Sequence, residues 1–249
     1  MARKPLCIDL FCGLGGWTEG FLAEGWDVIG FDIEQHVYGE HRYPAQLVLQ
    51  DVRTLRGSQF KDADMIVASS PCQEFSYRAM PWKRAKALGP PLLGMELFGQ
   101  AARIQREACA AAGRHIPLIQ ENVRGAQPWV GRARWHFGSY YLWGDVPALM
   151  PAARRARMKS NAGTPLGVKG PGRPRLITEE LVIDENAGTK GYAARLGQST
   201  ISRRHGSKSK ARKMASAQIA KIPAPLSRHI AHVFKPLSAS AVAGGGTDG

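Results

Sequence analysis

The chain has 249 residues, 44% of them hydrophobic, and a formal net charge of +14 at pH 7. This length and apolar content suit one well-buried domain with a small appendage and exclude a wholly disordered chain. The basic excess favours a polyanionic partner such as nucleic acid, and a solvated basic surface without a partner is the alternative.

Short apolar runs alternate with helical patterns through the first half of the chain. Residues 5–11 form an apolar run that ends in the glycine-rich stretch 12–16, and helical spacing follows over 17–23, which predicts a strand, a tight turn and a helix. Further buried strands are predicted at 26–31, 47–49, 64–68, 116–119 and 140–143, and further helices at 35–43 and 95–112. The alternation predicts an α/β fold with a doubly wound, mostly parallel sheet, whose ligands bind beyond the carboxyl ends of the strands.

The second half of the chain has a different composition. Pro, Gly and basic residues dominate from 145 to 213, with one strand-like run at 181–183. Helical spacing returns over 211–222 and 226–234, and a tail of small residues follows. We therefore expect a basic, loop-rich insertion before the last helices.

Cysteine spacing and hydropathy exclude several protein classes. The four cysteines, Cys7, Cys12, Cys72 and Cys109, form no C-x-x-C pair and are too sparse for a secreted disulfide framework. We expect reduced thiols, no bound metal and a cytoplasmic location. No run of about 18 apolar residues occurs, so neither a membrane span nor a signal peptide is expected.

The turn at 12–16 and the end of the second predicted strand suggest a nucleoside-bearing ligand. Glycines let backbone N–H groups and a helix N-terminus approach a ligand closely, although the turn lacks the full G-x-G-x-x-G pattern and a tight turn without a ligand is the alternative. Asp32 ends the next strand, about 20 residues downstream, where a carboxylate can accept hydrogen bonds from both ribose hydroxyls.

Cys72 is the candidate nucleophile. It follows a predicted buried strand and lies between Pro71 and Gln73. A reactive thiol must be accessible and activated, and this position allows both, whereas a buried core position suits Cys7 and Cys109. A Pro- and Gly-rich stretch that is suited to closing over a phosphate backbone follows, with Arg78, Lys83, Arg84 and Lys86.

Glu121 is the second candidate catalytic residue. It lies in Gln120-Glu-Asn-Val123, at the polar end of a predicted strand. A carboxylate there can protonate or hydrogen bond ring nitrogen 3 of a cytosine that a thiolate attacks at carbon 6. A helix cap or a salt-bridge partner is the alternative role.

Together these segments resemble the motifs of the DNA cytosine-5 methyltransferases. The resemblance rests on residues 9–16 with Glu19-Gly-Phe21, on Pro71-Cys-Gln73 with Phe75-Ser76, and on Glu121-Asn-Val123, in the family's order and spacing. It implies a Rossmann-like sheet that binds S-adenosylmethionine. It also implies a flipped-out cytosine that is methylated at carbon 5 through an adduct of Cys72 at carbon 6, with Glu121 at nitrogen 3.

The resemblance assigns cofactor contacts to individual residues. The turn would hold the amino acid part of S-adenosylmethionine, Asp32 the ribose and Asp51 the adenine amino group, with Ile33 beside the adenine. The full set implied is Phe11, Cys12, Gly13, Leu14, Gly15, Gly16, Asp32, Ile33, Asp51, Val52 and Pro71.

The match weakens after residue 125. The family's Gln-x-Arg-x-Arg pattern has its nearest counterpart in Val130-Gly-Arg-Ala-Arg134, without the leading Gln, so Arg134 is the candidate for orienting the base and Arg155 with Arg157 is a second candidate pair. The family's Gly-Asn-x-Val-Pro segment corresponds to Ile219-Ala-Lys-Ile-Pro223, without the Gly and Asn. Either Gln218 or a backbone group substitutes, or that cofactor contact is lost.

These assignments divide the chain into four predicted regions. They are a catalytic domain over 1–144, a basic target-recognition region over 145–213, C-terminal helices over 214–235 that return to the catalytic domain, and a disordered tail over 236–249. The expected partner is double-stranded DNA, and the expected enzyme is a monomer in a bacterial host cell, of phage or mobile-element type. Three rival functions are methylation of RNA cytosine, DNA binding without activity, and methylation of a small molecule.

Overall fold

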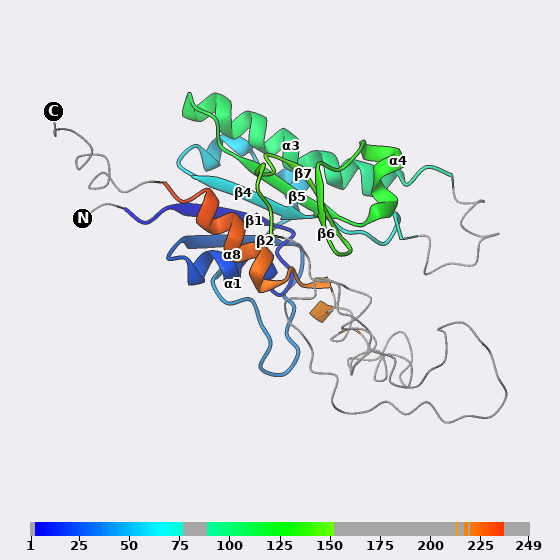
Figure 1. Cartoon of the computed structure of the whole chain (residues 1–249), viewed down its shortest axis with the longest axis horizontal. Helices are drawn as coiled ribbons and strands as arrows, with labels where there is room; N and C mark the ends of the chain where they lie inside the picture. Colours follow the sequence, from blue (N-terminus) through cyan, green and yellow to red (C-terminus); the bar gives the residue numbers. More distant parts are fainter. Residues whose placement is uncertain (1–2, 77–88, 152–212, 214–216, 219, 237–249) are drawn as a thin grey trace.

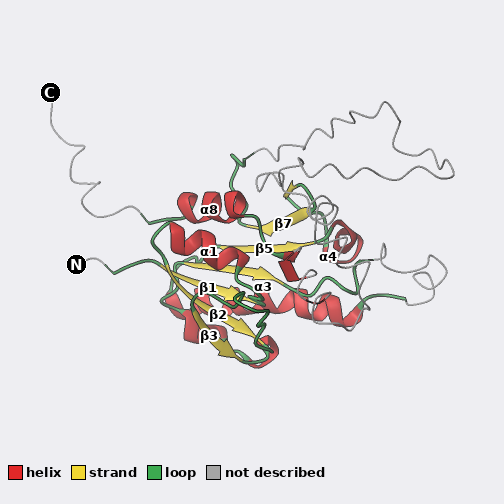
Figure 2. Cartoon of the chain, turned by 90° about the horizontal axis from the view of Figure 1, so that it is seen from below, coloured by secondary structure: helices red, strands yellow, loops and turns green. Residues whose placement is uncertain are grey.

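A computed structural model of the chain describes residues 3–76, 89–151, 213, 217–218 and 220–236. Most of the predicted basic region, the strand at 181–183, the tail from 237 and the arginine pair Arg155 and Arg157 lie outside the described residues. The basic residues of 77–88 lie outside them too. Within the described part, helices cover both faces of one central sheet (Figures 1 and 2).

The sheet has seven strands in the order β3-β2-β1-β4-β5-β7-β6. Its parallel strands are β1 (Leu6–Leu10), β2 (Asp27–Asp32), β3 (Gln46–Leu49), β4 (Met65–Ser69) and β5 (Leu118–Asn122). Antiparallel pairing adds the edge strands β6 (Trp135–Phe137) and β7 (Tyr140–Gly144). The predicted α/β fold with a mostly parallel sheet is confirmed, and only the short edge strand β6 was not predicted.

The helices bury both faces of the sheet. They are α1 (Gly16–Ala23), α3 (Leu92–Ala112), α4 (Gln127–Val130) and α8 (Ala224–Val233), with short 3-10 turns η1 (Val52–Thr54), η2 (Gly57–Phe60) and η4 (Arg124–Ala126). Alternate residues of β1 point to opposite faces: Cys7 packs with α1 and α8, whereas Ile8 packs with α3. Among the described helices, none is long and apolar enough to cross a membrane.

Close packing of α8 on α1 holds the C-terminal segment against the glycine-rich turn. A Cβ atom on Gly20 would lie 2.2 Å from the Ser227 hydroxyl, and one on Gly16 would lie 2.3 Å from the Ile222 backbone nitrogen. Trp26, directly before β2, donates its indole N–H to the Ala231 carbonyl at 3.1 Å. Glycine at positions 16 and 20 therefore allows the end of the chain to lie beside the turn.

The helix predicted over 35–43 is wrong. The structure has a turn there, with a bridge between Tyr38 and His41 and Gly39 in the left-handed region at φ 63°. The Tyr43 ring packs directly on Gly30 of β2, where a Cβ atom would lie 2.3 Å from the ring. Burial of this ring fixes the segment in an extended path that local helical spacing cannot override.

Candidate functional site

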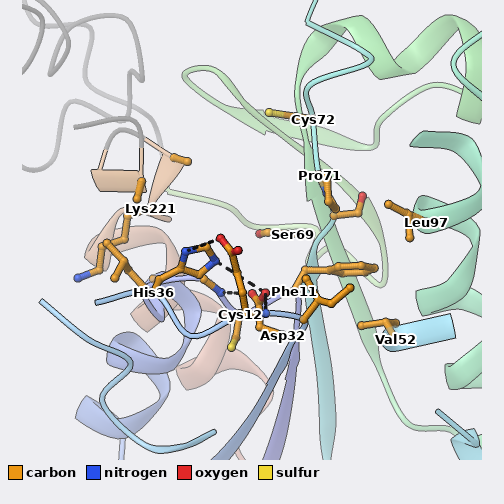
Figure 3. A pocket seen from close by; sticks show the side chains of 18 of the residues that line it. Phe11, Cys12, Asp32, His36, Val52, Ser69, Pro71, Cys72, Leu97 and Lys221 are labelled. Atoms are coloured by element: carbon orange, nitrogen blue, oxygen red, sulfur yellow. Dashed lines mark hydrogen bonds and ion pairs between the residues drawn. The ribbon is translucent and has the colours of Figure 1, made fainter. Parts of the chain in front are cut away.

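A cavity of about 690 Å³ opens at the carboxyl ends of the central strands. The glycine-rich turn, the end of β2, the segment after β4 and the end of β5 all contribute to its wall. Figure 3 shows Pro71 and Cys72 on one strand end and Asp32 with His36 on another, around a common opening. Apart from Gly15, every residue predicted to contact the cofactor lines this cavity, and so do Cys72 and Glu121.

The glycine-rich turn presents open backbone to the cavity. Phe11 and Gly13 both have positive φ, 56° and 52°, and a Cβ atom on Gly13 would have no neighbour within 4 Å. A non-glycine residue in this conformation costs roughly 1–3 kcal/mol, so the strain at Phe11 is held by the surrounding fold. A ligand can therefore approach the backbone at Gly13 closely.

Gly15 supports the turn, and its predicted contact with the cofactor stays a prediction. Its N–H group donates to the Cys12 carbonyl at 2.8 Å, and a Cβ atom on it would lie 2.6 Å from Pro44. At φ 78° it also caps the N-terminus of α1. Gly15 shapes the turn from behind and does not line the cavity.

Asp32 is an ionised hydrogen-bond acceptor at the end of β2. Its carboxylate accepts from the Gly13 N–H at 2.9 Å and from the Glu34 N–H at 3.3 Å, and His36 Nε2 lies 3.7 Å from it. Burial alone would raise the pKa of Asp32, but hydrogen bonds from His36, Gly13 and Glu34 outweigh burial and lower it. The bond to Asp32 in turn raises the pKa of His36.

The adenine side of the predicted cofactor site is more open. Ile33 is 70% exposed although it is apolar, so its side chain is available to a flat ligand. Asp51 caps η1 by accepting from the Arg53 N–H at 2.9 Å, and the Arg53 guanidinium lies 2.6 Å from its carboxylate. Hydrogen bonds from the Arg53 side chain and backbone lower the pKa of Asp51. The carboxylate predicted to reach adenine is thus already paired with an arginine.

The turn that carries Cys72 is held on both sides. Asn122 of β5 donates its amide to the Ser70 carbonyl at 3.1 Å and to its hydroxyl at 3.0 Å. On the other side, Phe75 is 1% exposed in an apolar cluster, and Glu74 accepts the N–H of Gly94 near the start of α3 at 2.6 Å. Cys72 itself is half-buried. The fold therefore fixes a partly accessible thiol at the cavity wall.

A second cysteine, Cys12, also lines the cavity but is chemically different. It is buried, and burial together with the charges of Asp9 and Asp32 raises the pKa of its thiol. A raised pKa keeps the sulfur protonated and weakly nucleophilic. Of the two thiols, the half-buried Cys72 is the better nucleophile.

Glu121 lies on the strand next to the Cys72 segment. Its Cα position on β5 pairs with Ser69 at the end of β4, three residues before the cysteine, and the side chain is 3% exposed. The Ser69 hydroxyl accepts the indole N–H of Trp17 at 3.0 Å. Burial, and secondarily the charge of Glu121, raises the pKa of Tyr140 behind it. The parallel pairing of β4 with β5 thus brings Glu121 and Cys72 to one wall.

Arg134 is not brought into this cavity. Its backbone N–H donates to the Leu142 carbonyl at 2.9 Å, which places it where β6 begins. The residue lines a second cavity of about 480 Å³ with Arg124 and Arg132. A role of Arg134 toward the target base stays a prediction.

Residues of the C-terminal segment contribute to the cavity wall. Lys221 and Ile222 line it, and the Tyr140 hydroxyl donates to the Lys221 carbonyl at 2.8 Å. The Lys221 ammonium pairs with Glu19 of α1. Gln218, predicted as a substitute for the family's asparagine, is not among the described residues that line the cavity.

A buried polar chain under the turn was not predicted. Thr18 donates to the Asp9 carboxylate at 2.6 Å, and its oxygen lies 2.6 Å from the Tyr43 hydroxyl. The second Asp9 oxygen is buried with no hydrogen-bond partner among the described residues. Burial raises the pKa of Asp9 to about 7. The sequence carries no signal for these hydrogen bonds, because Thr18 and Tyr43 come together only in the tertiary fold.

Sequence reasoning also missed several residues that line the cavity. They include Trp17, His36, Ser70, Leu93 and Leu97. Three of these had a usable spacing signal: His36 follows Asp32 by four residues, and Leu93 precedes Leu97 by four. Ser70 and Trp17 gave no signal, since their partners come from other strands.

The fold and the cavity define an α/β protein with a cavity beyond the carboxyl ends of parallel strands, where it presents a cysteine and a buried glutamate. Residues 6–125 match the model of the family described as C-5 cytosine-specific DNA methylase. The matched segment is similar to that family over its whole length, and it contains both Cys72 and Glu121.

Two curated relatives match shorter parts of the chain. Type II methyltransferase M.XorII from Xanthomonas oryzae pv. oryzae is 28% identical over 85 residues, which are 29% of this chain and 20% of the relative. Type II methyltransferase M.DdeI from Desulfomicrobium norvegicum is 33% identical over 78 residues, 28% of this chain and 19% of the relative. The matched part thus spans about a fifth of each relative's length.

Among solved structures, the Entamoeba histolytica methyltransferase EhMeth is similar over 51% of this chain and 40% of its own length. The identity is 16% and the TM-score is 0.32. The Schizosaccharomyces pombe Dnmt2 methyltransferase is similar over 50% of this chain and 36% of its own, at 16% identity and a TM-score of 0.29.

Proposed function

We propose that this chain is a DNA (cytosine-5-)-methyltransferase, which transfers a methyl group from S-adenosylmethionine to carbon 5 of a cytosine flipped out of the duplex. One observation carries the proposal. A single cavity joins Cys72 and Glu121 to the glycine-rich turn and Asp32, and all four features lie in the segment that matches the cytosine-5 methylase family. The family match favours DNA over RNA as the substrate.

The residues on one side of the cavity fit S-adenosylmethionine. Open backbone at Gly13 suits the amino acid part, the ionised Asp32 suits two ribose hydroxyls, and exposed Ile33 suits the adenine ring. Asp51 would reach the adenine amino group only by sharing its carboxylate with Arg53. When bound, S-adenosylmethionine supplies the methyl group from a positively charged sulfur.

On the other side of the cavity, Cys72 would act on the cytosine ring. Its thiolate adds to carbon 6, a carbon–sulfur bond forms, and the electron pair of the carbon 5–carbon 6 double bond moves toward carbon 5 and the ring. Glu121 would hold a hydrogen bond or proton at nitrogen 3 and so stabilise the charge that develops there. Once carbon 5 carries the methyl group, loss of its proton restores the double bond and expels Cys72 as thiolate.

Base flipping follows from the position of the thiol. Cys72 lies on the wall of a cavity, and a cytosine stacked in a duplex hides the two ring faces through which carbon 6 and carbon 5 must react. Removing a base from the stack costs a few kcal/mol, which contacts between the protein and the DNA backbone must offset.

Tritiated S-adenosylmethionine tests the proposal. Purified protein is incubated with it and with unmodified duplex DNA or transfer RNA, and the polymer is then digested to identify the labelled nucleoside. We expect label in 5-methyldeoxycytidine with the wild type and none with Cys72→Ser.

The matched control is Cys109→Ser, because Cys109 is half-buried like Cys72 but lies outside the cavity. It should label DNA as the wild type does. Label in transfer RNA alone would replace the proposal with the RNA enzyme, and label in neither polymer would contradict both.

A further inference from the structure

We propose that Arg53 positions the carboxylate of Asp51 for recognition of adenine, so that this arginine determines how strongly the cavity prefers adenine to its deaminated form, hypoxanthine. The inference rests on the proposed function, because it concerns how the methyl donor of that same site is recognised. Arg53 lines the cavity together with Asp51 and Val52. The resemblance to the cytosine-5 methyltransferases assigns roles to Asp51 and Val52 but none to Arg53.

The Arg53 side chain holds both oxygens of the Asp51 carboxylate. Its Nε donates to Oδ1 at 3.1 Å and to Oδ2 at 3.0 Å, and its Nη2 donates to Oδ2 at 2.6 Å. The backbone N–H of Arg53 donates to Oδ1 at 2.9 Å. A forked guanidinium group that contacts both oxygens of a carboxylate fixes the plane of that carboxylate. Within the described part of the chain, Arg53 alone thus sets the orientation of the Asp51 side chain.

The bonds from Arg53 leave little acceptor capacity on Asp51. An ionised carboxylate offers about four acceptor sites. Arg53 occupies three of them with its backbone N–H, its Nε–H and its Nη2–H. One N–H of an adenine amino group fits the site that remains. Hypoxanthine carries a carbonyl oxygen at the same position, and two acceptors that face each other repel.

The turn that carries the pair is held against α3. The Arg53 Nη1 lies 4.0 Å from the Glu96 carboxylate of that helix. Arg103, also on α3, donates to the Val52 carbonyl at 3.3 Å, and the Val52 side chain is buried. The backbone between Asp51 and Arg53 is therefore fixed before a ligand binds, which keeps the cost of ordering the site low.

Apolar side chains beside the pair suit the faces of a purine ring. Figure 3 shows Phe11, Val52 and Leu97 on the same side of the cavity. These side chains cannot distinguish adenine from hypoxanthine, because the two rings have the same shape. A site that hydrogen bonds a ligand group rejects an analogue that lacks the group, since its own polar atoms then stay unpaired. Discrimination therefore falls to Asp51 and Arg53.

Calorimetry with two ligands tests the inference. They are S-adenosylhomocysteine, which is the cofactor without its methyl group, and S-inosylhomocysteine, its deaminated analogue. The ratio of their dissociation constants is the adenine preference. We expect a preference of about 10- to 100-fold in the wild type, the effect of one hydrogen bond to a charged group. Arg53→Ala should lower it to less than about threefold, mainly by weakening binding of S-adenosylhomocysteine.

A double-variant cycle separates positioning from direct contact. If Arg53 acts through Asp51, then Asp51→Ala should lower the adenine preference as far as Arg53→Ala does, and the double variant should lower it no further. A preference that falls further in the double variant would overturn the inference, since Arg53 would then contact the ring itself. A preference that rises in Arg53→Ala would also overturn it, because Arg53 would then compete with adenine for Asp51.

Two more variants separate geometry from charge. Arg53→Lys keeps the charge but loses the forked donors, so its adenine preference should stay below about a third of the wild-type value. Arg56→Ala removes the charge of an exposed arginine outside the cavity and should keep the wild-type preference. A wild-type preference in Arg53→Lys, or an equal loss in Arg56→Ala and Arg53→Ala, would overturn the inference. If urea denaturation shows that Arg53→Ala is unfolded, Arg53→Lys decides.

Failure of this inference is distinguishable from failure of the proposed function, because binding is measured without DNA. Wild-type protein that methylates DNA, together with an unchanged preference in Arg53→Ala, removes the role of Arg53 and leaves the enzyme. Wild-type protein that prefers adenine through Arg53 but transfers no methyl group to DNA removes the proposed function and leaves the role of Arg53. Wild-type protein that binds the two ligands equally overturns the inference.

Discussion

The two walls of the Cys72 cavity are built in different ways. The cofactor wall is made by residues 11–16 and Asp32. It consists of backbone with positive φ angles and of one carboxylate that accepts a hydrogen bond from the backbone N–H of Gly13. The cysteine wall, made by residues 69–72 and Glu121, depends on side chains that meet across β4 and β5. The two functions should therefore be separable: changes to the first wall should alter cofactor affinity, and changes to the second should alter the chemical step.

The largest separation is expected for Cys72→Ser. Without a thiolate no adduct forms at carbon 6, so methyl transfer should fall by more than roughly 1000-fold. Affinity for S-adenosylmethionine should stay within about twofold, because the turn and Asp32 are unchanged. Radiolabel transfer and calorimetry measure the two quantities, and a parallel loss of both would show that the walls are not independent.

Asp9→Asn tests the buried support of the cofactor wall. The pKa of Asp9 is about 7 in the folded protein, above its ordinary value of 3.8. The folded state thus binds a proton that the unfolded chain has lost, so wild-type stability should fall as pH rises from about 4 to about 7 and level off above that. The variant lacks this titration.

Urea denaturation at several pH values measures the effect. Between about pH 5 and pH 8 the stability of Asp9→Asn relative to wild type should increase by up to about 3 kcal/mol. Two parallel stability curves would show that Asp9 does not titrate in this range and would remove the explanation based on burial.

Asp32→Asn weakens the cofactor wall while keeping the shape of the side chain. A hydrogen bond to a charged group contributes about 1.5–3 kcal/mol, so the dissociation constant for S-adenosylmethionine should rise about 10- to 100-fold. DNA affinity without the cofactor should not change. Asp27→Asn, on an exposed residue at the opposite end of β2, is the control and should bind S-adenosylmethionine normally. Equal losses in both variants would argue against a ribose contact.

Asn122→Ala should give the smallest loss of activity, because it changes only the support of the cysteine wall. It removes two hydrogen bonds to Ser70, which contribute about 1–2 kcal/mol together, and leaves the Cys72 turn less restrained. We expect a lower kcat with unchanged S-adenosylmethionine affinity. Gln120→Ala, which loses a buried bond to the Phe98 carbonyl, should lose similar stability but keep its kcat. A normal kcat in Asn122→Ala would remove its positioning role.

The same difference between the walls explains how much could be predicted from the sequence. The turn and Asp32 are local features, because a glycine cluster after an apolar run and a carboxylate at the next strand end are visible in consecutive residues. Cys72 and Glu121 were found individually for the same reason. Cys72 and Glu121 lie at one wall because β4 pairs with β5. That pairing depends on the order of strands in the sheet, which consecutive residues do not reveal.

Where prediction failed, the deciding contacts were tertiary. The segment 35–43 is not helical because Tyr43 packs on Gly30. β6 is three residues long and two of them are exposed, so it carries no alternating apolar pattern. Arg134 was chosen by resemblance to a family motif, and that resemblance weakens after residue 125. Its position next to β7 depends on the β6–β7 hairpin, and the sequence pattern did not predict β6.

The most direct test of the central claim is to trap the adduct on Cys72. A duplex that contains 5-fluorocytosine at a methylated site is incubated with S-adenosylmethionine and protein, because fluorine at carbon 5 prevents the proton loss that would expel the thiolate. We predict a complex of protein and DNA that survives denaturing electrophoresis, with the DNA attached to the peptide containing Cys72, and no complex with Cys72→Ser. Attachment at another residue, or an equal yield with Cys72→Ser, would contradict the account.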